Sequence, residues 1–342
     1  MKSLINYRQL PDRIPVLSSR SPATRARLKF VASVLFAVLT VGASLLVARR
    51  LTDSTWPLQH VSPWLCAAAA AAYLASFVLR ARAWHRLFPR NECPDQANCL
   101  ASVGAAAASG AVLPFRLDYF VKVGMLRKLG GIRVGLGAIV LSIVSLGMID
   151  AIAMLPLSIS ATATSNNVLR GPLLVVVIFG IGCCTLLVIG GRMARLPLLR
   201  RSRRLRTLGE HVARHTAPGG RKDAVVAWVY LFACWSSRAF GSAALLSGLG
   251  LSFSPRVALA VICLAAAAGV IPITSGGVVV NAGAGVAILL ALGVGKDIAI
   301  NFSLASGLLI VVAALTASIC GVLASFAIRL LSRRELARTS PA

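Results

Sequence analysis

Charged residues are absent from long blocks of this chain. Uncharged stretches cover 30–48, 61–79, 96–115, 171–191, 257–295 and 298–328, and two more, 134–169 and 224–255, are interrupted only by Asp150 and Arg238. A helix needs roughly 20 predominantly apolar residues to cross a bilayer. The pattern therefore predicts an all-α fold, a polytopic transmembrane helical bundle with about seven or eight membrane segments, some of them broken or re-entrant.

Composition points the same way. Hydrophobic residues make up 57% of the 342 residues and charged residues 13%, about half the fraction of a soluble domain. These values exclude a soluble enzyme. The formal net charge of +26 could suggest a nucleic-acid partner, but the basic residues stand in short stretches between apolar runs, as the positive-inside rule describes. We therefore expect no nucleic-acid binding.

The basic residues also predict an orientation. The N-terminal segment, 80–98, 116–133, 192–222 and the C-terminal tail hold 30 of the 36 Lys and Arg residues, and the remaining loops hold five. Basic loops stay on the cytoplasmic side. This bias predicts a plasma (inner) membrane protein with both termini in the cytoplasm. Contact of these loops with anionic lipid headgroups is compatible with the same pattern.

The sequence predicts three parts along the chain. Residues 1–27 form a basic cytoplasmic leader, 28–328 a single transmembrane domain that includes the cytoplasmic loop 192–222, and 329–342 a cytoplasmic tail.

Two membrane segments are interrupted, one in each half of the chain. The segment near 96–120 lies between two basic loops, so we expect it to re-enter the membrane without crossing. The stretch 257–295 is too long for one helix and breaks at Pro272, as a re-entrant hairpin or as two short crossings. The run 298–328 must tilt, kink near Gly307 or protrude. Paired discontinuous segments point to a transport site near the bilayer midplane.

The densest group of charges at a membrane boundary is Arg116, Asp118 and Lys122. In one interpretation, Arg116 and Lys122 bind a headgroup phosphate and Asp118 positions Arg116 or a cationic group. In the other, this is an interfacial loop with a local Arg116–Asp118 pair.

Asp150 and Arg238 are the isolated charges within predicted spans. An intramembrane carboxylate is a functional candidate by default. Either Asp150 and Arg238 form a structural pair that locks two helices together, or they belong to a proton or substrate site.

The stretch that follows Pro272 is rich in small and polar residues. These residues either line a cavity and bind substrate, or they allow ordinary close helix packing. The candidates are Thr274, Ser275, Gly276, Gly277 and Asn281.

The sequence shows no arrangement typical of catalysis. It contains no Ser/His/Asp set, no phosphate-cradling loop and no paired carboxylates on one helix. The loop between Cys93 and Cys99 has too few ligands for a metal, and its predicted cytoplasmic side disfavours a disulfide. We therefore expect no enzyme activity, no cofactor and no metal.

The early motif resembles that of the flippase-like family of the lysylphosphatidylglycerol synthase transmembrane region. That family carries a Pro-x-Arg-x-Gly-Glu-x-x-Arg pattern. Pro114, Arg116 and Lys122 fall in register with it, while Asp118 occupies the Gly place and Tyr119 the Glu place.

Two further family patterns are matched in part. In the following span the family has Arg-x-x-Asp; Asp150 fits, and Gly147 replaces the Arg. Later the family has Pro-x-x-Pro-Gly-Gly-x-Gly-x-x-Glu, with which Pro272, Gly276 and Gly277 agree. The replaced positions there are Ser275, Val279 and Ala282.

The resemblance covers roughly residues 28–328 and implies a bundle that carries lipids or glycolipids between leaflets. Bifunctional members continue into an aminoacyl-transferase domain; this chain ends at Ala342, and we expect no such domain. We expect translocation of an anionic phospholipid or a lipid-linked glycan, with Asp150 coupling protons. The expected partners are membrane lipids and a separately encoded transferase. The rival hypotheses are a non-catalytic subunit that presents lipid to that transferase, and a membrane scaffold whose loop 192–222 recruits a partner or anionic lipid.

Overall fold

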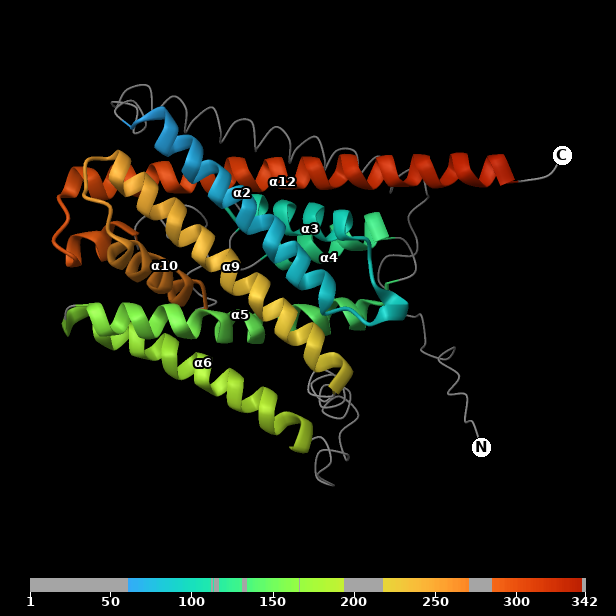
Figure 1. The fold of residues 1–342 in the computed structure, drawn as a ribbon, viewed down its shortest axis with the longest axis horizontal. Coiled ribbons are helices and arrows are strands. Elements are labelled where there is room, and N and C mark those ends of the chain that lie inside the picture. The colour runs from blue at the N-terminus through green and yellow to red at the C-terminus, as the bar shows by residue number, and fades with distance from the viewer. Residues whose placement is uncertain are drawn as a thin grey trace, which may run out of the picture. The chain divides into compact units, whose positions relative to one another are not determined.

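The computed structural model is helical throughout the part of the chain that it describes (Figure 1). It describes residues 61–111, 113, 117–130, 134–165, 167–193, 218–270 and 285–339, which all belong to one compact unit, Pro57–Ala342. These residues contain no strand. The all-α prediction is confirmed for them.

The helices follow the apolar stretches closely. Their bounds are α2 Pro63–Arg86, η1 Arg90–Glu92, α3 Gln96–Gly110, α4 Asp118–Gly130, α5 Leu136–Thr164, α6 Asn167–Met193, α9 Pro218–Gly248, α10 Pro255–Val270 and α12 Lys296–Thr339. A short helical stretch also covers 285–291.

Five of the described helices are long and apolar enough to cross a membrane: α2, α5, α6, α9 and α12. This number establishes a multi-pass membrane protein. The predicted first span, 30–48, lies outside the described residues, so the predicted total of about seven or eight segments stays a prediction.

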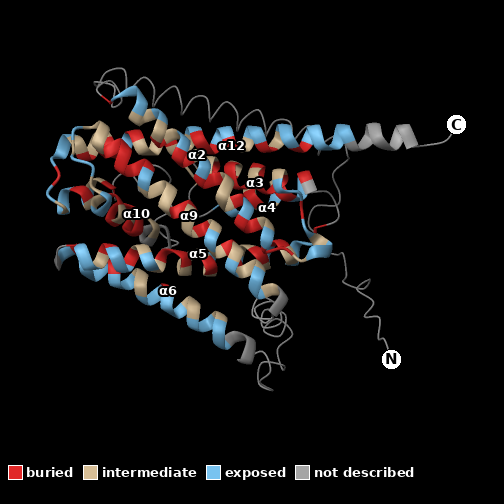
Figure 2. Cartoon of the chain, in the orientation of Figure 1, coloured by how far each residue is buried: buried red, intermediate tan, exposed pale blue. Residues whose placement is uncertain are grey.

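Two pairs of long helices form the frame of the bundle. α2 packs most extensively against α9, and α5 packs along α6, with α9 and α10 both contacting α5 (Figure 1). Buried side chains line the inner surfaces of these helices, whereas α6 exposes most of its length (Figure 2). Its exposed side chains include Val175, Ile178 and Ile181. Large apolar groups on an outer face are what a lipid-contacting helix presents.

The segment that was expected to re-enter forms a pair of short helices. α3 has 15 residues and α4 has 13, or roughly 22 and 20 Å at 1.5 Å per residue, and each is shorter than a hydrocarbon core of about 30 Å. They contact each other, and α3 also packs on α12. α3 ends at Gly110 and α4 begins at Asp118, while Pro114 itself lies outside the described residues.

The region 116–133 is not the loop that its charges indicated. Most of it is α4, which buries Leu126 and Leu129 against the bundle and leaves Phe120 exposed.

The late segment is described only in part. α10 ends at Val270, two residues before Pro272, and proline disfavours helix both at its own position and at the residue before it. The break itself lies outside the described residues. α12 is one continuous helix of 44 residues, roughly 66 Å long, so it is longer than a hydrocarbon core of about 30 Å, and the choice among tilt, kink and protrusion stays a prediction.

Small residues bring α3 and α12 into close contact. A Cβ placed on Gly104 of α3 would lie 2.5 Å from the carbonyl oxygen of Ala314 and 2.6 Å from the amide nitrogen of Ser318, both in α12. Gly321 of α12 meets the backbone of Ala101 in α3 at similarly close range. The two backbones approach this closely because neither glycine has a side chain.

Gly104→Ala should therefore destabilise the protein. The added methyl group would have to push α12 away from α3, and overpacking of this kind costs about 1–3 kcal/mol. A thermal unfolding curve in detergent should show a lower Tm. Gly182→Ala is the matched control, because no atom lies within 4 Å of that Cβ position in α6, and its Tm should not fall. An equal loss for both variants would contradict the close α3–α12 contact.

Candidate functional site

The inner face of α2 carries aromatic, hydroxyl and cationic side chains at helical spacing. Tyr73, Ser76, Phe77, Arg80 and Trp84 follow one another at intervals of one, three or four residues and so share one side of the helix. The three aromatic residues and the serine are buried. Arg80 therefore points into the bundle with them.

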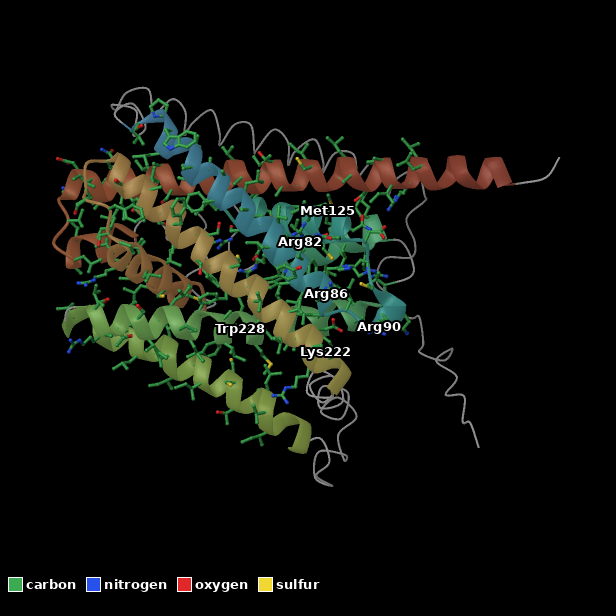
Figure 3. The ribbon with its side chains drawn as sticks, viewed as in Figure 1. Arg82, Arg86, Arg90, Met125, Lys222 and Trp228 are labelled. Atoms are coloured by element: carbon green, nitrogen blue, oxygen red, sulfur yellow. The ribbon has the colours of Figure 1, made fainter. Side chains whose placement is uncertain are left out.

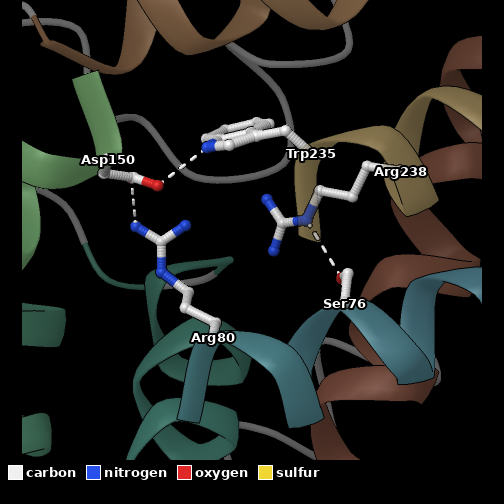
Figure 4. Close-up of polar contacts among 5 residues, drawn as sticks. All are labelled: Ser76, Arg80, Asp150, Trp235 and Arg238. Carbon is white, nitrogen blue, oxygen red and sulfur yellow. Dashed lines mark hydrogen bonds and ion pairs between the residues drawn. The ribbon is translucent and has the colours of Figure 1, made fainter. Parts of the chain in front are cut away.

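Asp150 lies at the midpoint of α5 and meets this face. Nη2 of Arg80 donates a hydrogen bond to Oδ2 of Asp150 at 2.6 Å, and Nε1 of Trp235 in α9 donates to Oδ1 at 2.7 Å (Figure 4). Each carboxylate oxygen thus has a donor from a different helix. The contact joins α2, α5 and α9 at one point.

The predicted pairing of Asp150 with Arg238 is wrong, because the partner is Arg80. Nε of Arg238 instead donates to Oγ of Ser76 at 3.1 Å (Figure 4). Arg80 had been assigned to the basic loop 80–98, but α2 continues to Arg86 and carries Arg80 inside the bundle. Arg238 remains beside this pair, and the charges of Arg80 and Asp150 both act on it.

Aromatic rings support both guanidinium groups. The Cζ atoms of Arg80 and Arg238 lie 5.9 and 5.2 Å from the centroid of the Trp235 ring. The Cζ atom of Arg238 also lies 5.3 Å from the ring of Phe77. Cation–π contacts attract a cation without neutralising its charge.

Lys122 of α4 adds a third cation. Its side chain is 7% exposed, and Nζ lies 4.1 Å from the centroid of the Trp84 ring. Nε1 of Trp84 donates to Oγ of Ser142 at 2.9 Å, which fixes the ring against α5. Lys122 is thus buried in the bundle and does not belong to an interfacial loop. Burial and, to a lesser extent, the charge of Arg80 lower the pKa of Lys122 to about 7.

We call Arg80, Lys122, Arg238 and Asp150 the cation cluster. It combines three basic side chains with one carboxylate, on four different helices. Positive charge therefore exceeds negative charge within the cluster, and guanidinium groups bind phosphate and carboxylate oxygens in bidentate fashion. This arrangement can bind an anion.

The other predicted site residues are only partly placed. Asp118 begins α4 next to Gly110, where α3 ends. The remaining early candidate, Arg116, lies outside the described residues. So do all five late candidates: Thr274, Ser275, Gly276, Gly277 and Asn281.

A second polar contact lies at the end of α2. Sγ of Cys93 is 3.4 Å from Nδ1 of His85, and this thiol is exposed. Burial of part of the group raises the pKa of the Cys93 thiol, and the charge of Asp95 raises it further. The neutral thiol is a poor nucleophile, because the thiolate is the reactive form. Within the described residues no group of three His, Cys, Asp or Glu side chains could hold a metal.

Comparison with known families assigns the chain. The model of the lysylphosphatidylglycerol synthase TM region matches residues 28–318, most of the chain. The chain belongs to this family. No curated protein and no solved structure gave a significant match. The match spans every helix from α2 to α10 and about half of α12, so the whole cation cluster lies within the region that defines the lysylphosphatidylglycerol synthase TM family.

At one position where the chain departs from the family pattern, the structure supplies the missing cation from another helix. Gly147 stands in α5 where the pattern has an Arg, and no atom lies within 4 Å of its Cβ position. The cation next to Asp150 is supplied from α2 by Arg80. The sequence does contain a signal for Arg80, since it keeps helical spacing with Phe77 and Trp84. Trp235 carried no comparable signal, because its contact with Asp150 depends on how α9 is rotated against α5.

Arg80→Gln should destabilise the protein strongly. It leaves the carboxylate of Asp150, whose side chain is 14% exposed, without its cation, and breaking a largely buried pair of this kind costs up to about 3 kcal/mol. Thermal unfolding in detergent should show a large fall in Tm. Adding Asp150→Asn to this variant should recover part of the loss.

Arg86→Gln is the matched control. Arg86 pairs with Asp223 at 3.7 Å, but their side chains are 50% and 34% exposed, and surface pairs contribute about 0–1 kcal/mol. Equal falls in Tm for Arg80→Gln and Arg86→Gln would contradict the claim that the Arg80–Asp150 contact stabilises the protein more than the exposed pair does.

Proposed function

We propose that this protein translocates a lipid between the two leaflets, and that the headgroup of this lipid carries a phosphate. The lipid is an anionic phospholipid or a lipid-linked glycan. The observation that supports the proposal is the cation cluster, in which Arg80 pairs with the one carboxylate while Lys122 and Arg238 lie against aromatic rings. The family match supports a membrane role, and the substrate and the translocation itself are our inference.

The position of the cluster suits this task. Asp150 stands at the midpoint of α5, a candidate membrane span, and Trp235 lies near the middle of α9. A phosphate that crosses the membrane loses its hydration there, and a charge at the bilayer centre is unfavourable by about 3 kcal/mol even on insertion scales. Guanidinium and ammonium donors at that depth replace part of the lost hydration.

Arg238 is the side chain that we assign to first contact with the phosphate. The contacts recorded for it are the hydroxyl of Ser76 and the faces of Phe77 and Trp235. None of these carries a negative charge. Lys122 is held in a similar way, against the face of Trp84, but burial lowers the pKa of its ammonium group to about 7, so Arg238 is the cation assigned to first contact.

This proposal assigns no chemical reaction to the chain. Lipids are the proposed partners, together with a separately encoded transferase that makes or uses the transported lipid. Presentation of lipid to such an enzyme without translocation is the competing function.

Reconstitution tests the proposal. Proteoliposomes containing a fluorescent anionic phospholipid should show protein-dependent redistribution between leaflets when the outer label is quenched, with less redistribution of a zwitterionic analogue. Arg238→Gln should lower the rate about tenfold, the effect of losing one charge-assisted hydrogen bond.

Arg82→Gln is the control for this measurement. Arg82 is an exposed residue of α2, and Figure 3 shows it with Arg86, Arg90 and Lys222 near the end of the bundle where α2 ends and α9 begins. The rate of this variant should match that of the unchanged protein. Redistribution only after a transferase is added would favour the presenting subunit, and redistribution in neither case would favour a scaffold.

We also propose that the loop after α2 faces the cytoplasm of a cell bounded by a plasma (inner) membrane, with both termini on the same side. The exposed thiol of Cys93 tests this orientation. A membrane-impermeant maleimide, applied at mildly alkaline pH so that the thiolate forms, should label it in inverted vesicles and leave it unlabelled in intact cells. Cys93→Ser identifies the labelled position by its loss of signal. Labelling of Cys93 in intact cells would reverse the orientation.

A further inference from the structure

Asp150 is the anion of the cation cluster, and its two contacts are of the kind that a substrate anion would make. One of its oxygens accepts from the charged Nη2 of Arg80 at 2.6 Å, and the other accepts from the neutral indole of Trp235 at 2.7 Å. Phosphate oxygens accept from the same kinds of donor. The carboxylate is therefore an internal equivalent of the ligand.

The Arg80–Asp150 pair is partly open. The side chain of Arg80 is 23% exposed and that of Asp150 is 14% exposed, whereas Lys122 is 7% exposed. A guanidinium group has five N–H donors, and the hydrogen bond to Asp150 uses one. Arg80 is thus the member of the pair that is more exposed to a second anion.

Arg238 brings a ligand to this opening. Arg80 and Arg238 lie against the same indole ring, that of Trp235, and the charge of Arg80 acts on Arg238. A phosphate that binds Arg238 therefore arrives next to the pair formed by Arg80 and Asp150 (Figure 4).

We propose that Asp150 is a positioning residue that competes with the substrate phosphate for Arg80, an inference that rests on the function proposed above. In the empty site Asp150 binds Arg80. When phosphate reaches Arg238, Arg80 exchanges the carboxylate for a phosphate oxygen, and the indole of Trp235 continues to donate to Asp150. The return of Arg80 to Asp150 then releases the lipid.

The physical need for such a competitor follows from the charge of the site. Three cations in a low-dielectric interior bind a phosphate strongly, and Coulomb energies grow as the effective dielectric constant falls. A transport site must bind well enough to admit its ligand and weakly enough to release it. A built-in carboxylate lowers the net affinity by offering Arg80 an alternative partner.

Titration of the purified full-length protein with inorganic phosphate and with glycerol phosphate tests the exchange. Asp150→Asn should lower Kd about tenfold, because Arg80 no longer has a competing anion. The same variant should translocate lipid more slowly, because release is impaired. Glycerol phosphate bound more tightly than inorganic phosphate would identify the lipid headgroup as the source of the anion.

Two controls separate this role from a merely structural one. Asp223→Asn removes the carboxylate of the exposed pair with Arg86 and should change neither Kd nor the translocation rate. In an Arg80→Gln background, Asp150→Asn should leave Kd unchanged, since the competition acts through Arg80. Weaker or unchanged phosphate binding by Asp150→Asn alone would overturn the inference.

Infrared spectroscopy gives an answer if Asp150→Asn does not fold. In protein labelled with ¹³C-aspartate, added phosphate should shift one carboxylate band, because Asp150 loses its contact with Arg80. That band is assigned by its displacement in Trp235→Phe, which removes the donor to Oδ1. No shift on addition of phosphate overturns the exchange.

The two proposals fail in different ways. If the unchanged protein neither binds phosphate nor moves lipid, the proposed function is wrong and the exchange falls with it. If the unchanged protein does both, but Asp150→Asn binds phosphate no more tightly, only the exchange is wrong.

Discussion

A carboxylate at the midpoint of a membrane-spanning helix must find partners inside the protein, and the arrangement of this bundle depends on that requirement. Asp150 obtains a cation from α2 and an indole N–H from α9, so three helices have to meet at one depth and in one rotation. Apolar packing between helices in a bilayer is not directional in this way. The ion pair selects one register from the many that apolar contacts would allow.

The same site contains two basic side chains, Arg238 and Lys122, beyond the one that pairs with Asp150. Arg238 and Lys122 are held by aromatic faces and a hydroxyl, which keep them in place without neutralising them. Lys122 reaches the site because α4 packs beside α3, and α3 in turn packs on α12 through glycines. The close α3–α12 contact thus supports, through α3, the helix that carries Lys122.

Much of the fold and part of the site could be predicted from sequence. The apolar blocks located the long helices, and Asp150, Arg238 and Lys122 were singled out as charges in an apolar context. The partner of Asp150 and the helical state of 116–133 were not predicted correctly. Both errors have one cause, since a basic residue near the end of an apolar block was assigned to a loop. Arg80 and Lys122 both continue a helix and point inward, while Arg127 and Lys128 of the same α4 are exposed.

The sequence by itself determined that this chain is a multi-pass helical membrane protein. That conclusion needs only local information, because a run of apolar residues in a bilayer has to satisfy its backbone hydrogen bonds within its own helix. The tertiary structure alone decided which cation pairs with Asp150 and which side chain holds its second oxygen. Those contacts depend on the relative rotation and depth of separate helices, and no spacing within a single segment specifies either one.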